Sequence, residues 1–156
     1  MAYQPKAGRF STKKEIRDKL VEVLKDTSVE NVLPERTTNV EDEALPVIGV
    51  YALKERYSTL HRNRNANGDL RIIHRRDLIL AVEILAEEET DQLLSDRLDQ
   101  IADEVWDAIE ASDKLGGLVH DINMEEAMAT EPRGGRRPQG SWIINLNITY
   151  VKKPKE

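Results

Sequence analysis

The chain has 156 residues, of which 33% are charged and 39% hydrophobic, proportions typical of one soluble globular domain. It contains no cysteine, which excludes disulfide frameworks, thiolate metal sites and cysteine nucleophiles. Its net charge of −6 argues against a general nucleic-acid binder. No apolar run reaches the ~20 residues that span a bilayer, and no signal-peptide core begins the chain. We therefore expect a protein made in the cytoplasm, without membrane contact.

The N-terminal part predicts a flexible arm, a helix and a strand. Residues 1–12 carry no periodic pattern and are expected to form the arm. Thr12 and Glu15 have the spacing of a capping box, which predicts a helix over residues 13–26. The β-branched run 47–53 predicts the first strand. The apolar stripe of the expected helix comprises Ile16, Leu20, Val23 and Leu24.

The C-terminal part predicts a second helix among three strands. Residues 76–85 are apolar on both strand faces, with Glu83 as the interruption, which indicates a buried strand. A short strand is expected over residues 118–124 and a closing strand over 141–151, before a charged tail at 152–156. On one face the closing strand carries Trp142, Ile144, Leu146, Ile148 and Tyr150.

The second helix is expected to begin after Thr90 and to end at Gly116 and Gly117. Four acidic residues surround the cap, where the positive end of the helix favours negative charge. These are Glu87, Glu88, Glu89 and Asp91. The apolar stripe comprises Leu94, Leu98, Ile101, Val105 and Ile109, and Ala102, Trp106 and Ala108 are expected to widen it.

This order predicts an α+β domain over residues 13–151. We expect a mixed or antiparallel four-stranded sheet with two packed helices, in the order α-β-β-α-β-β, and long extended loops or β-arms. Two connections, 54–75 and 125–140, exceed the ~12–15 residues that are usual for ordered loops, and such long loops are usually functional or disordered.

The first connection is basic, with six Lys or Arg against two acidic residues, a local charge of +4. Asn67 and Gly68 favour a tight turn, so an extended β-arm folded at its tip is one interpretation. We favour contact with an acidic surface of another subunit. Contact with DNA phosphates and a merely solvated loop are the alternatives.

The second connection, with Arg133, Arg136 and Arg137 among glycines, lacks the strand and helix context of a phosphate-binding loop. We interpret it as a loop that orders on contact with a neighbouring molecule. The three histidines His61, His74 and His120 are too scattered to predict a metal site, and no serine has a nucleophile-elbow setting. We expect neither enzymatic activity nor a cofactor.

Four segments together resemble one protein family. They are the strand 76–85, the helix 98–109, the segment 117–122 and the closing strand 140–150. In order and pattern, residues 13–151 resemble the tail terminator proteins of long-tailed bacteriophages and prophages, also known as tail completion or minor tail protein U-like proteins. The resemblance depends on layout and on a soft apolar pattern, because the family has no short signature motif.

The resemblance implies a structural protein of the virion tail and neck, assembled in the host cytoplasm. Such proteins form a hexameric ring on the last ring of the tail tube, end tube elongation and present the head–tail joining surface. The implied partners are other copies of the chain, the tail tube protein, the head–tail connector or neck proteins and, in contractile tails, the sheath protein. DNA passes through the channel of the ring without specific binding. The family implies no catalysis and no cofactor.

A ring interface is heterologous, so one face of each subunit must complement a different face of the next. We expect charged residues from the basic and acidic stretches to make these contacts. The expected interface residues are Arg56, Arg62, Arg64, Arg71, Arg75, Arg76, Arg133, Arg136, Arg137, Glu87, Glu88, Glu125 and Glu126, and the stretch 41–43 is also acidic. Two alternatives stay open: another neck protein (head completion or head–tail connector), or a DNA-binding adaptor that uses the basic arm, residues 54–76.

Overall fold

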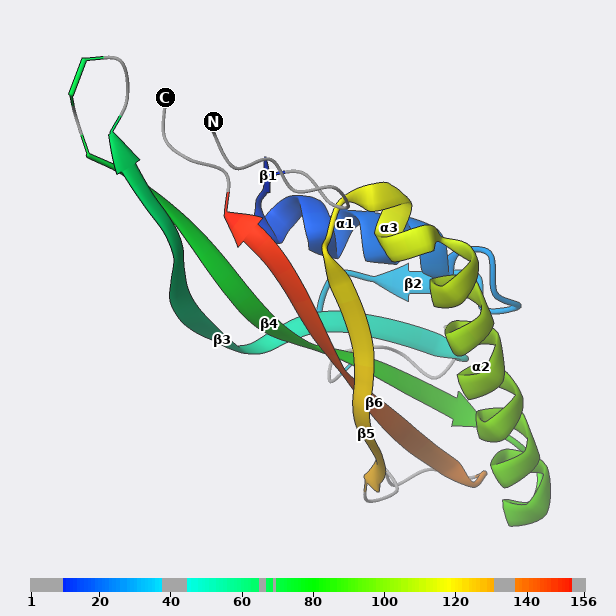
Figure 1. Ribbon diagram of the computed structural model, residues 1–156. Coiled ribbons are helices and arrows are strands. Elements are labelled where there is room, and N and C mark those ends of the chain that lie inside the picture. Colours follow the sequence, from blue (N-terminus) through cyan, green and yellow to red (C-terminus); the bar gives the residue numbers. More distant parts are fainter. Residues whose placement is uncertain (1–9, 38–44, 65–66, 69, 131–136, 153–156) are drawn as a thin grey trace.

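A computed structural model describes the chain apart from residues 1–9, 38–44, 65–66, 69, 131–136 and 153–156. The described part is an α+β fold with three helices and one curled, mixed sheet of six strands (Figure 1). In chain order the elements are β1 (Phe10–Ser11), α1 (Lys13–Leu24), β2 (Asn31–Leu33), β3 (Val47–Arg64), β4 (Leu70–Glu87), α2 (Asp91–Ala111), α3 (Asp113–Gly117), β5 (Asp121–Thr130) and β6 (Gln139–Lys152).

Both long helices begin at the predicted caps. The Thr12 hydroxyl accepts from the Glu15 backbone N–H at 3.2 Å, the N-cap bond of the predicted capping box, and it also donates to the Glu15 carboxylate at 3.1 Å. Thr90 accepts from the Leu93 backbone N–H at 3.2 Å. The helix ends differ from prediction, because α1 ends at Leu24 and α2 at Ala111. No helix within the described ranges is long and apolar enough to cross a membrane.

The main core lies between one face of the sheet and the apolar stripes of α1 and α2. The whole predicted stripe of α1 is buried, and so are Ile101, Val105 and Ile109 of α2. The predicted face of β6 is confirmed, since its alternate residues join the same cluster. Burial of each large aliphatic side chain contributes roughly 1.5–3 kcal/mol, which makes this layer the main source of stability. Trp106 was expected to widen the α2 stripe, but it is 37% exposed.

The opposite face of the sheet is covered in part by the connection between β2 and β3. These strands are parallel, so the chain must return to the starting end of the sheet before β3 begins. On its way the Thr37 backbone N–H and hydroxyl both donate to the Glu83 carboxylate. Glu83, the predicted interruption of an otherwise apolar strand, therefore has its hydrogen-bond partners in a segment for which the sequence predicted no contact.

The expected four-stranded sheet was wrong in number, because two short strands add to it. β1 pairs in parallel with the end of β6, so Phe10 and Ser11 belong to the sheet rather than to the expected arm. β2 pairs in parallel with the start of β3. Strands of two or three residues are too short to show a recognisable periodicity. They form only because they pair with strands that are distant in the sequence.

The two long connections are shorter than expected, because strands occupy most of 54–75 and half of 125–140. β3 and β4 pair from Val47 opposite Leu85 to Arg64 opposite Leu70, so 54–75 forms a β-hairpin arm, one of the two predicted forms. Gly68 has a φ of +81°, which suits its place at the turn. In the second connection, residues 125–130 belong to β5 and residues 139–140 to β6.

The expected strand over residues 118–124 starts too early, because β5 begins at Asp121. Residues 113–117 all have positive φ and form the single turn α3. The glycine pair therefore ends this left-handed turn rather than α2, and Leu118 and Val119 are buried just after it. The charged tail falls partly in β6, which includes Lys152, and residues 153–156 lie outside the described part.

We predict that Gly49→Ala destabilises the fold by about 1–3 kcal/mol. An added Cβ would lie 2.4 Å from the backbone carbonyl oxygen of Glu35, which cannot move without displacing the crossing segment. Urea unfolding checks this value. Gly140→Ala is the matched control in another strand, because its Cβ would meet side chains rather than backbone, with Leu94 at 3.2 Å and Leu98 at 3.7 Å. Equal stability of the two variants would contradict the close approach.

Candidate assembly surfaces

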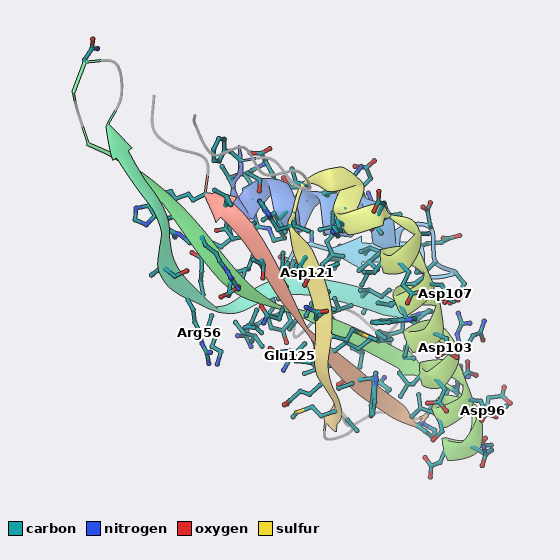
Figure 2. All side chains as sticks on the ribbon, viewed as in Figure 1. Arg56, Asp96, Asp103, Asp107, Asp121 and Glu125 are labelled. Atoms are coloured by element: carbon teal, nitrogen blue, oxygen red, sulfur yellow. The ribbon has the colours of Figure 1, made fainter. Side chains whose placement is uncertain are left out.

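The basic arm, residues 54–76, extends β3 and β4 beyond the helices (Figure 1). Arg56 is exposed and points away from the body of the domain (Figure 2). The Arg75 side chain is 48% exposed, and its guanidinium lies 3.5 Å from the Asp77 carboxylate. The strands of the arm include the backbones of three more predicted interface residues, Arg62, Arg64 and Arg71. The structure does not describe their side chains. The arm thus presents cations to solvent.

A buried polar cluster stiffens the base of the arm. The Arg76 guanidinium lies 2.7 Å from one Glu55 carboxylate oxygen, and the Tyr150 hydroxyl donates to the other at 2.8 Å. The same guanidinium sits 4.1 Å from the centre of the Tyr57 ring. Burial and the Glu55 carboxylate raise the pKa of Tyr150. Arg76, predicted at an interface, is therefore bound within its own chain.

A β-bulge makes this cluster possible. The register of β3 against β4 shifts between Ala52 and Lys54, which places Glu55 opposite Leu78. Without this extra residue, the alternation of β3 would place Glu55 on the other face, away from Tyr150. The side chain of Glu55 is only 5% exposed, so the position of the bulge decides which charge of the arm is buried.

A second cluster joins the end of β4 to the start of β6. The Glu87 carboxylate accepts from the Gln139 side chain at 2.7 Å and lies 3.6 Å from the Arg137 guanidinium. The Glu88 backbone N–H donates to the Pro138 carbonyl at 3.0 Å. Three predicted interface residues thus take part in contacts within the chain, although Arg137 remains half exposed. The predicted Arg133 and Arg136, and the acidic stretch 41–43, lie outside the described residues.

The strand β5 carries the acidic residues Glu125 and Glu126 that the sequence analysis expected at an interface. Both are exposed, as is Asp121 (Figure 2), and the Glu125 carboxylate accepts from the Asn147 amide at 3.0 Å. Among the described strands, β5 pairs only with β6, so its outer edge has no strand beside it. We refer to this outer side as the β5 edge.

The outward face of α2 is a further acidic surface that the sequence analysis did not select. The helix contains seven acidic residues and one arginine. Exposed acids recur at helical spacing, at Asp96, Asp99, Asp103 and Asp107. Figure 2 shows Asp96, Asp103 and Asp107 on the side of the molecule opposite Arg56. The spacing of these acids is visible in the sequence, because each follows the previous one by three or four residues.

The described residues form no group suited to a metal ion, and they include one histidine with a shifted pKa. No group of three or more His, Cys, Asp or Glu side chains among them could hold a metal ion. Burial, with the nearby cations Lys114 and Arg75, lowers the pKa of His120, and its Nε2 is buried without a hydrogen-bond partner. This imidazole therefore favours its neutral form.

Comparisons with known proteins leave the family undecided. The sequence matches no protein-family model. A search of curated proteins likewise finds no match.

We predict that Arg76→Met lowers the free energy of unfolding by about 3 kcal/mol, because it leaves the buried Glu55 carboxylate without its cation. Arg75→Met is the matched control at the neighbouring position, and its exposed ion pair should contribute about 0.5 kcal/mol or less. Chemical denaturation of both variants measures the difference. Similar losses in the two variants would show that the Glu55 cluster does not depend on its ion pair.

We predict that stability falls more steeply with acid in the native protein than in His120→Gln. Because the folded state lowers the pKa of His120, the unfolded chain binds more protons below the ordinary pKa of 6.5. This contribution is complete above that value and is lost as the pH falls towards the folded pKa. Thermal unfolding between about pH 7.5 and about pH 5.5 measures the slope. Identical slopes would contradict the assignment.

Proposed function

We propose that this protein is a structural component of a phage virion that caps the tail tube as a ring. In this role it ends tail elongation and forms the surface to which the head is joined. The observation that supports the proposal best is the separation of charge, with the basic arm on one side of the molecule and the acidic face of α2 on the other (Figure 2). The resemblance of residues 13–151 to tail terminators supports the same role.

This separation of charge favours head-to-tail assembly. Two copies that met through the same surface would bring like charges together, which is unfavourable. Contact between the arm side of one copy and an acidic side of the next brings opposite charges together and leaves both surfaces available for further copies. A repeated heterologous contact closes into a ring when its rotation divides a full turn. The charges therefore set orientation, while apolar contacts supply affinity.

The proposed partners follow from the position of such a ring. One surface of the ring would meet the tail tube protein, and the other would meet head–tail connector or neck proteins; the sheath protein is a further partner in a contractile tail. The proposal includes no catalysis and no cofactor. The net charge of −6 suits a channel through which DNA moves without specific binding, because phosphates are repelled by an acidic wall.

The first experiment is to measure the mass of the purified protein by light scattering, alone and with tail tube protein, and to image the same fractions by negative stain. We expect rings, either free or only on tube ends. Rings that bind head connectors but ignore tubes would instead favour another neck protein. A strict monomer that ignores tubes and binds duplex DNA at low salt would overturn the proposal in favour of a DNA-binding adaptor.

We predict that Arg56→Glu weakens self-association or tube binding roughly tenfold, the effect of about 1.4 kcal/mol, because it reverses an exposed charge of the arm. Lys25→Glu is the matched control, since it makes the same change on an exposed residue at the end of α1, away from the arm. Concentration-dependent light scattering measures both variants. Equal weakening in the two would attribute the effect to net charge rather than to the arm.

A further inference from the structure

Large apolar side chains are exposed on two strands in particular. Of the six large hydrophobic residues that are exposed in the described part, four lie on β3 and β5. They are Leu53, Tyr57, Met124 and Met128, with exposed fractions of 46%, 66%, 37% and 48%. Exposed residues of this kind on neighbouring positions mark contact surfaces more often than isolated ones do.

These two strands form opposite borders of the sheet. The partner β2 covers only residues 47–49 of β3, so from Val50 onward no described strand pairs with the outer side of β3. The β5 edge is equally unpaired within the described ranges, and all its described side chains except Ile122 are exposed. We refer to the outer side of residues 50–58 as the β3 edge. Long unpaired edges expose backbone donors and acceptors that bind another strand readily.

The two edges carry opposite charges. Lys54 and Arg56 are exposed on the β3 edge, whereas the third charged residue there, Glu55, is buried against Arg76. The exposed charges of the β5 edge are all negative, at Asp121, Glu125 and Glu126. Each edge would therefore repel a copy of itself and attract the other edge.

The strand directions also suit a junction between copies. β5 is antiparallel to β6, β6 to β4 and β4 to β3, so β5 and β3 run in opposite directions within one chain. If neighbouring copies are related by a rotation about an axis parallel to the strands, each strand keeps its direction in every copy. The β5 edge of one copy would thus meet the β3 edge of the next in antiparallel orientation, like the long strand pairs of the sheet itself.

We infer that the β5 edge of one copy adds to the β3 edge of the next, so that one sheet continues from subunit to subunit. The partner is a second copy of this chain. Closure of the repeated contact into a ring rests on the proposed function. Backbone hydrogen bonds supply the pairing, the apolar residues of both strands are covered, and the opposite charges select one edge for the other.

The chain has no cysteine, so single cysteines can be placed at will. The test uses the variant Ser58→Cys/Ala127→Cys, which keeps the charges of both edges, treated with a short bismaleimide that spans several registers and analysed on a denaturing gel. The matched control is Ser58→Cys/Ser95→Cys, which moves the second cysteine to α2. We expect the first variant to give a ladder of linked copies and the control to give monomers.

Two other outcomes would overturn the inference and are distinguishable. Rings in the images, with a ladder in the α2 control and none in the edge variant, would overturn the edge contact but leave the proposed function intact. A monomer in every assay, with or without tail tube protein, would overturn both. Far-UV circular dichroism verifies that each variant is folded.

Hydrogen exchange on the unmodified protein gives a second, independent measurement. Amides on the outer side of an edge strand have no partner in the neighbouring strand, and strand addition should slow the exchange of such amides in residues 121–130 when copies associate. We expect slower exchange in both 121–130 and 50–58 in the assembled fraction relative to dilute monomer. Slower exchange in α2 alone would contradict the inference.

Discussion

The structure depends on one constraint, the pairing of β4 with a long strand on each side. β4 is bonded to β3 from Leu85 to Leu70 and to β6 from Glu87 to Arg75. Within the body of the domain it therefore has no free edge, and its residues are buried on both faces. The helices pack on one face, and the segment around Thr37 covers part of the other. Because β6 pairs with β4 only as far as Arg75, no other strand of the described residues pairs with the hairpin beyond that point.

The shape of the arm follows from small irregularities in this pairing. The bulge in β3 turns Glu55 towards Tyr150, and the ion pair with Arg76 then joins three strands at the point where the arm leaves the body. A buried charge pair adds little net stability, but it penalises any register that separates its partners. The cluster therefore fixes the register of the arm, while neighbouring Arg56 and Arg75 remain available to solvent.

The charged surfaces and the two strand edges favour the same mode of assembly. The cations of the arm lie on the side of the molecule opposite the acids of α2 (Figure 2). The two open strand edges differ in the same way, because the β3 edge is basic and the β5 edge is acidic. The broad charge pattern would orient approaching copies, since electrostatic attraction acts over about a Debye length of 10 Å. The edges would then define the final register through directional hydrogen bonds. Because the two levels agree in sign, orientation at long range would favour the proposed pairing at short range.

The sequence by itself determined the elements whose signal is local. Thr12 and Thr90 mark helix starts through caps, α1 shows its buried stripe through helical spacing, and β6 shows its core face through alternation. The strand 76–85 was recognisable because it is apolar on both faces. The β-arm could also be predicted from the sequence, since Asn67 and Gly68 favour a tight turn at its tip. Each of these signals depends on neighbours within a few residues.

Tertiary structure alone decided the rest. β1 and β2 exist because distant strands pair with them, and the hydrogen bonding of Glu83 depends on Thr37, far away in the chain. Among expected interface residues, nothing local distinguishes Arg76, which is bound to Glu55, from Arg75, which is half exposed. The physical reason is that strand pairing and ion pairing are long-range choices, which local periodicity cannot encode.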